Sequence, residues 1–296
     1  MQHDFNSFRK FKTTNNELEL EHMKTLENHT LLYDEDCPLC QVYTSGFIRT
    51  GMLDQNGRQA YTAMTYDAQN FIDIERASNE IALVDNENKT VTYGIESLLK
   101  VLGVRFPFIE KTGHLKPVKY LLKKLYSFIS YNRKVIIPSP ENKTNELQCL
   151  PSFSTEYRLF YILISGILTT FTLFYFSKNN SIPPHGSLIR EGLITSGQLL
   201  FQGALIYKLN KKTILNYFGN LMTISLMGSL MLLPLLIINL MIPLHEIIFS
   251  IGFGITIFIM FFEHFRRVKL LKLPSFLSFT WALYIVLILI TILILN

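Results

Sequence analysis

Several features that would direct a functional assignment are scarce in this sequence. The formal net charge is only +5 over 296 residues, and the polar half has no basic stripe interleaved with aromatic residues, so we expect no nucleic-acid partner. The first residues, Met1 to Phe5, include an acid and lack the apolar core of a signal peptide, so we expect no cleaved leader. Cysteine is also rare, with 3 residues, and the polar half contains no second C-x-x-C, C-x-x-H or close histidine pair that would complete a zinc site.

Apolar residues are abundant and unevenly distributed. Hydrophobic residues make up 49% of the chain, which is high for a soluble protein. Up to about residue 156 the sequence is polar and charged, whereas from Tyr157 onward it is dominated by runs of Leu, Ile, Phe and Met. We therefore expect a soluble domain followed by a membrane domain over residues 157–296.

Five stretches of the second half approach the roughly 20 residues that a helix needs to cross a bilayer core. The expected spans are residues 157–176, 189–208, 214–241, 245–264 and 274–295. The second is the most polar, because it contains Arg190, Glu191, Gln198 and Gln202. Such groups usually face a bundle interior or a cavity, or tie neighbouring helices together.

Basic residues indicate how these spans are oriented. Lysines and arginines follow the second and fourth spans, at positions 208–212 and 266–272, whereas the other two connections contain only Lys178. By the positive-inside rule, the N-terminal domain and both basic connections lie in the cytoplasm. Five spans then place Asn296 outside. We expect an integral protein of a bacterial cytoplasmic membrane, with the lipid bilayer as its surroundings.

The polar half has the element order of a small α/β domain. We expect residues 1–28 to form an N-terminal arm and residues 136–156 a linker into the membrane. Between them, over residues 29–135, the pattern predicts strand, helix, strand, helix, hairpin and helix, with the second strand at residues 58–64 and the second helix at residues 68–77. This is the order of a thioredoxin-like fold, a small sheet with helices on both faces. The predicted fold class is thus an α/β thioredoxin-like N-terminal domain plus an all-α transmembrane bundle of about five spans.

The stretch from Tyr33 to Cys40, YDEDCPLC, is where residue types and spacing together indicate chemistry. Leu31 and Leu32 predict the end of a strand, and Pro38 suits the first position of a helix. Both sulfurs then lie within disulfide reach on a strand-to-helix turn. Cys37 would be the N-cap residue, beside unpaired backbone N–H groups and the positive end of the helix dipole, and this setting favours the nucleophilic thiolate.

The run from Leu31 to Cys40 resembles the signature of the DCC family (DUF393) of predicted thiol-disulfide oxidoreductases, which opens with a strand and D-x-x-C-x-x-C. Further stretches are similar to that family's strand, glycine-led helix, helix end and closing helix, namely Leu83-Val84-Asp85, Tyr93 to Leu99, Leu102-Gly103 and Tyr126 to Arg133. The resemblance covers about residues 29 to 135. It implies a thioredoxin-like fold, a dithiol/disulfide activity, and Asp34, Cys37 and Cys40 as the motif residues.

In an oxidoreductase, reduced Cys37 attacks a substrate disulfide and Cys40 resolves the mixed disulfide, so the Cys37–Cys40 disulfide serves in place of a bound cofactor. Asp34 could accept the proton of Cys40. Against this, Asp34, Glu35 and Asp36 place negative charge beside Cys37, which opposes the effect of the helix terminus. The alternatives for the pair are half of a zinc site and a chemically idle pair.

We therefore expect a membrane-anchored thiol-disulfide oxidoreductase of the protein-disulfide reductase type, because the cytoplasm is reducing. Thioredoxins place a cis-proline opposite the cysteine pair, and no proline occurs here between Gln41 and Phe106. The substrate could accordingly be a disulfide-bearing protein or a small thiol. In the alternative, the membrane helices carry the function as a quinone-handling or small-solute module or an assembly partner, and the thioredoxin-like domain is a redox sensor or anchor.

Overall fold

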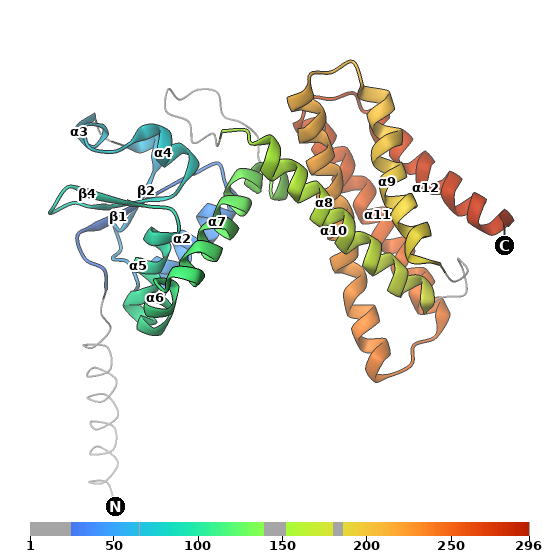
Figure 1. The fold of residues 1–296 in the computed structure, drawn as a ribbon, viewed down its shortest axis with the longest axis horizontal. Helices are drawn as coiled ribbons and strands as arrows, with labels where there is room; N and C mark the ends of the chain where they lie inside the picture. The colour runs from blue at the N-terminus through green and yellow to red at the C-terminus, as the bar shows by residue number, and fades with distance from the viewer. Residues whose placement is uncertain (1–24, 65, 139–151, 180–185, 296) are drawn as a thin grey trace, which may run out of the picture. The chain divides into compact units, whose positions relative to one another are not determined.

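The computed structural model describes residues 25–64, 66–138, 152–179 and 186–295, and it divides into two compact units (Figure 1). The first unit extends to Ser130, and the second comprises residues 131–140 and 153–296. Helix α7 (Lys116–Ile136) contributes residues to both units. Most of the expected N-terminal arm and most of the expected linker lie outside the described residues.

A mixed four-stranded sheet forms the centre of the first unit. Its strands are β1 (His29–Tyr33), β2 (Arg58–Ala60), β3 (Ala82–Asp85) and β4 (Thr90–Tyr93), in the order β2-β1-β3-β4. β1 pairs with β2 in parallel and with β3 antiparallel, and β3 pairs antiparallel with β4. Leu31 fixes the register at the centre, because it lies opposite Arg58 on one side and Leu83 on the other.

Helices cover both faces of this sheet. They are α2 (Pro38–Arg49), α3 (Tyr66–Gln69), α4 (Ile74–Asn79), α5 (Ile95–Arg105), α6 (Pro107–Gly113) and α7. Successive side chains of a strand point to opposite faces. Leu31 accordingly packs in one apolar cluster with Phe47 of α2 and Val101 of α5, whereas Leu32 packs in a second cluster with Tyr61 and Ile72. Both faces are therefore buried, which agrees with the consecutive apolar residues at the centres of β1 and β3.

Two predicted elements of this unit differ from the observed ones. The strand expected over residues 58–64 ends at Ala60, and a short 3-10 helix (Tyr61–Ala63) follows it. The helix expected over residues 68–77 is divided into α3 and α4. The division has a local cause, because the Asp73 carboxylate accepts the Arg76 N–H at 2.9 Å and so begins a new helix.

The second unit is a bundle of five helices, joined by the last turn of α7. They are α8 (Thr155–Lys178), α9 (Leu188–Ile206), α10 (Lys211–Met241), α11 (Glu246–Leu270) and α12 (Phe276–Leu295). α8, α10, α11 and α12 are long and apolar enough to cross a membrane. α9 occupies the position of the second predicted span but is not among these four, because Arg190, Glu191, Gln198 and Gln202 lower its hydropathy.

α8 and α10 begin at the same end of this bundle. The Tyr161 hydroxyl, near the start of α8, lies 2.8 Å from the Thr223 hydroxyl in the first half of α10. Arg267, near the end of α11, hydrogen-bonds Asn220 of α10 at 2.9 Å. Since α8 ends at the far side, α9 must return along the bundle to reach the start of α10, and it packs against α8 and α12 as it does so (Figure 1).

Side chains are distributed in the bundle as a lipid environment requires. Within α9, the side chains of Glu191, Gln198 and Gln202 are buried, whereas Leu193 and Leu200 are 67% and 75% exposed. The other bundle helices likewise expose many large apolar side chains. A water-soluble protein rarely exposes contiguous apolar surface of this extent. The surface of this unit therefore suits the acyl chains of a bilayer.

Candidate functional site

The end of β1 and the start of α2 hold the D-x-x-C-x-x-C segment in one tight turn. Cys37 is the N-cap residue of α2, with φ −97° and ψ 107°, and Pro38 follows in the first turn. The Cys37 N–H donates to the Asp34 carbonyl oxygen at 3.2 Å. The Asp36 N–H donates to Asp34 Oδ1 at 3.1 Å. Asp34 thus shapes, through its main chain and its side chain, the loop that carries Cys37.

The three predicted site residues lie together on this turn and are all buried. The exposed fractions are 5% for Asp34, 3% for Cys37 and 6% for Cys40, and both cysteines are thiols rather than a disulfide. Thiol-disulfide exchange requires direct approach of the substrate sulfur to the attacking thiolate. Burial of Cys37 therefore restricts the access of any disulfide to this thiol.

Hydrogen bonds fix the surroundings of the cysteine pair. The Thr62 hydroxyl donates to Glu35 Oε1 at 2.5 Å, so one of the acidic groups near Cys37 has a neutral partner. The Thr44 hydroxyl donates to the Cys40 carbonyl oxygen at 2.7 Å and anchors the first turn of α2. The Arg58 guanidinium, 3.3 Å from Thr44 Oγ1, brings a positive charge from β2 to the same helix.

A second concentration of polar groups lies inside the bundle and joins four helices. The Tyr217 hydroxyl of α10 lies 2.9 Å from Gln202 Oε1 of α9 and 3.1 Å from His264 Nε2 of α11. His264 Nδ1 lies 2.9 Å from the Ser278 hydroxyl of α12, and its ring stacks on Trp281 at 5.4 Å between centroids. All five side chains are buried. The pattern of spans places His264 at a helix end, so only the fold reveals this network.

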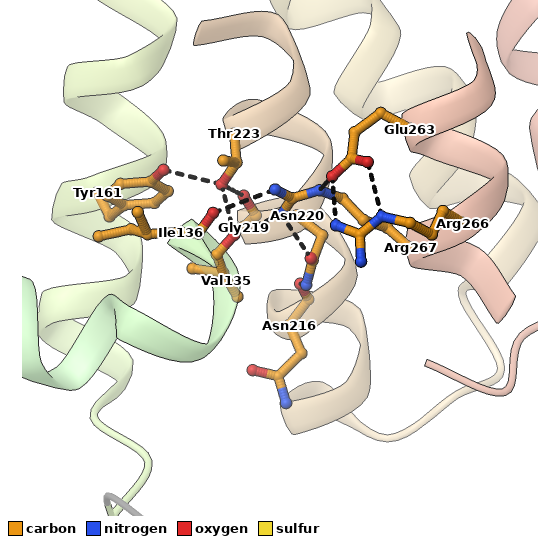
Figure 2. Close-up of polar contacts among 10 residues, drawn as sticks. All are labelled: Val135, Ile136, Tyr161, Asn216, Gly219, Asn220, Thr223, Glu263, Arg266 and Arg267. Carbon is orange, nitrogen blue, oxygen red and sulfur yellow. Dashed lines mark hydrogen bonds and ion pairs between the residues drawn. The ribbon is translucent and has the colours of Figure 1, made fainter. Parts of the chain in front are cut away.

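A third polar group surrounds the last turn of α7 (Figure 2). Arg267 Nη1 donates to the Val135 carbonyl oxygen, and Arg267 Nη2 donates to the Ile136 carbonyl oxygen at 3.1 Å. Arg267 Nε donates to Glu263 Oε1 at 2.7 Å, and Glu263 is also bound by Arg266. The last carbonyl groups of a helix have no intrahelical partner and carry the negative end of its dipole. Arg267 therefore caps α7 inside the membrane unit.

Comparisons with known proteins identify no relative, since no family model, no curated protein and no solved structure matches the chain. The resemblance to the DCC family accordingly depends on the motif residues alone. Within the part of the chain that the structure describes, no group of three or more His, Cys, Asp or Glu side chains is placed to hold a metal ion.

Proposed function

We propose that this protein is a membrane-anchored thiol-disulfide oxidoreductase whose first unit is a thioredoxin-like domain of the DCC type. The position of Cys37 carries the proposal. It is the N-cap residue of α2, directly after the central strand β1, and Cys40 lies one helical turn later. A helix N-terminus lowers the energy of the thiolate, which is the attacking species in thiol-disulfide exchange.

The sheet topology supports the thioredoxin-like assignment. The order β2-β1-β3-β4, with β3 antiparallel to both neighbours and helices on both faces, agrees with the order expected for a thioredoxin-like sheet. Ile81 precedes β3 at the place where thioredoxins have the cis-proline. The Ile81 N–H already donates to the Tyr126 hydroxyl at 2.8 Å. The burial of Cys37 favours a small disulfide over an extended protein segment as the substrate.

The proposed reaction transfers two electrons from the dithiol to the substrate. The Cys37 thiolate attacks one sulfur of the substrate disulfide, forms a mixed disulfide and releases the other sulfur, which takes up a proton. The Cys40 thiolate then attacks Cys37 Sγ, releases the second substrate thiol and leaves the Cys37–Cys40 disulfide. Asp34, buried on the same turn, is the proposed acceptor of the Cys40 proton.

The test uses the full-length protein, reduced and reconstituted in lipid nanodiscs, with hydroxyethyl disulfide as the substrate. We expect the protein to release two substrate thiols per chain, Cys37→Ser to release none, and Cys40→Ser to retain a mixed disulfide visible by mass spectrometry. Cys149→Ser is the matched control, because the proposal gives that cysteine no role. Equal thiol release from the parent and from Cys37→Ser would refute the proposal.

We also infer that α9 crosses the bilayer, giving five spans with the first unit in the cytoplasm and the C-terminus outside. Its 19 residues return along the bundle between α8 and α10 with their polar side chains turned inward. Five crossings place the basic connections at 208–212 and 266–272 on the same side as the start of α8. If α9 did not cross the bilayer, both basic connections would lie on the opposite side from the start of α8, against the positive-inside rule.

The buried polar residues of α9 favour a second candidate function, in which the bundle handles a quinone or small solute, or assembles with a partner, and the first unit is a sensor or anchor. Removal of residues 157–296 separates the two candidates in a complementation assay. Loss of the cellular role, while the dithiol activity persists, would favour the second.

A further inference from the structure

A cavity of about 150 Å³ lies within the bundle and is lined by residues from all five of its helices. Thr169, Gln198, Ser229 and Thr256 contribute polar atoms near the middle of α8, α9, α10 and α11, and α12 contributes Trp281 and Tyr284. The Arg190–Glu191 ion pair lines the wall near the start of α9, and most of the remaining wall is formed by Leu, Ile, Met and Phe side chains. The cavity therefore lies at the depth of the hydrocarbon core and has a small number of polar groups in an apolar wall. This combination is typical of a small-molecule site.

Two of the lining side chains lack a hydrogen-bond partner within the described structure. They are Gln198, through Nε2, and Thr169, through its hydroxyl, and their exposed fractions are 8% and 6%. Gln202 lies one turn beyond Gln198 on the same face of α9. Its Oε1 accepts from the Tyr217 hydroxyl and its Nε2 donates to the Thr280 hydroxyl. An unpaired donor in an apolar interior is unfavourable, and buried polar groups at membrane depth are usually retained for a function. Gln198 and Thr169 therefore present two donors to whatever occupies the cavity.

The volume limits the size of that occupant. An engineered protein cavity of about 150 Å³ binds benzene, so a space of this size accepts one six-membered ring. Trp281 lines the wall, so an aromatic side chain is available for contact with such a ring. The free donors of Gln198 and Thr169 require an acceptor on the ring, such as a carbonyl oxygen. A ligand that reaches this depth must also dissolve in the bilayer.

We propose that this cavity binds the head group of a single-ring benzoquinone, with Gln198 and Thr169 donating hydrogen bonds to one of its carbonyl oxygens. The proposal concerns the second unit alone and does not depend on the dithiol activity of the first. It assigns Gln198 a role in ligand recognition and leaves Gln202 a structural role between helices.

The test uses Trp281, which is the only tryptophan of the chain and lines the cavity, as a fluorescent reporter. The full-length protein in lipid nanodiscs is titrated with decylplastoquinone, a single-ring quinone with an alkyl tail. We expect saturable quenching of the tryptophan emission. Gln198→Leu removes a donor and should raise the dissociation constant about tenfold, the effect of roughly one lost buried hydrogen bond.

Ser196→Leu is the matched control, because it introduces the same residue two positions earlier on α9, at an exposed site outside this cavity. We expect it to bind decylplastoquinone like the parent. Thr169→Val is a second cavity variant, which tests the proposal if Gln198→Leu does not give folded protein; it should also weaken binding.

Three outcomes would overturn the proposal. Quenching that never saturates and is equal in parent and cavity variants would mean that the quinone only partitions into the bilayer. Equal affinity for decylbenzene, which has no carbonyl oxygen, would identify an apolar chain as the occupant. Binding of decylplastoquinone with unchanged affinity by both cavity variants would place its site elsewhere on the protein.

Discussion

Replacement of Arg267 by methionine tests whether the cap on α7 stabilises the membrane unit. The substitution keeps an unbranched apolar stem and removes the guanidinium. It leaves the Val135 and Ile136 carbonyl oxygens without these donors and removes a 2.9 Å bond to Asn220 Oδ1. The Glu263 carboxylate remains paired with Arg266 at 2.7 Å, so the change does not leave this partly exposed acid without a basic partner.

The expected loss follows from the number and kind of these bonds. A hydrogen bond from a charged donor contributes about 1.5–3 kcal/mol net in a soluble protein. Within membrane bundles, measured side-chain hydrogen bonds average about 0.6 kcal/mol. Arg267→Met also removes the bond from Arg267 Nε to Glu263 Oε1, so four bonds are lost and the limits are roughly 2 and 12 kcal/mol. Partial access of water to this end of the bundle favours the lower part of the range, and we expect Arg267→Met to reduce the free energy of unfolding by about 3 kcal/mol.

Arg266→Met is the matched control for this measurement. The two arginines are adjacent and bind the same carboxylate, but the side chain of Arg266 is 50% exposed whereas that of Arg267 is 6% exposed. Exposed ion pairs contribute about 0–1 kcal/mol, so we expect only a small effect. Unfolding in mixed micelles with increasing sodium dodecyl sulfate measures both variants. A loss below about 1 kcal/mol for Arg267→Met, or equal losses for the two variants, would contradict the assignment of Arg267 as a cap.

Three further predictions address other parts of the chain. Hydrogen bonds from Asn88, first from its side chain, lower the pKa of Asp85 from 3.8 to about 2. Because the folded-state pKa is the lower one, this stabilisation is complete above about pH 4 and is lost as the pH falls toward 2. Acid unfolding followed by circular dichroism should therefore show that the stability of Asp85→Asn depends less on pH in this window than the stability of the parent does. Cysteines introduced at Lys178 and Lys208 in a cysteine-free background should react with a membrane-impermeant maleimide from opposite sides, and reaction from one side would exclude a spanning α9. Tyr217→Phe should lower the unfolding free energy by about 1 kcal/mol in the micelle assay, because the hydroxyl joins three helices; an unchanged value would show that the network adds no stability.

The cysteine turn was predictable because its signals are local in sequence. The adjacent apolar residues Leu31 and Leu32 indicate a strand, and Pro38, directly after Cys37, indicates the first position of a helix. The strand predicted over residues 58–64 is shorter in the structure, and the reason is not local. The Tyr61 hydroxyl donates to the Ile74 carbonyl oxygen at 2.9 Å, and this tertiary contact holds the chain in a 3-10 turn where propensity favours a strand.

In the bundle, prediction from the sequence is limited for a different reason. The polar residues of α9 were predicted to face an interior, a cavity or neighbouring helices, but their individual roles were not predictable. Gln198 and Gln202 are one helical turn apart, have the same side chain and share a face. Gln202 lies level with Tyr217 of α10 and bonds to it, whereas Gln198 lies level with the cavity. The difference is set by which residues of α10 and α12 come opposite each glutamine, and helix packing alone determines that.

Two groups of buried polar residues in the bundle can be assigned different roles. His264, Tyr217 and Gln202 satisfy one another across several helices, and a satisfied network of this kind specifies how the helices pack. Gln198 and Thr169 have no such partner in the described structure and open onto one cavity. Buried polar groups in stable proteins nearly always have a hydrogen-bond partner. Two buried donors without one that line the same cavity therefore fit a role in binding a ligand better than a role in helix packing. Mutations in the first group should therefore change stability before binding, and mutations in the second should change binding before stability.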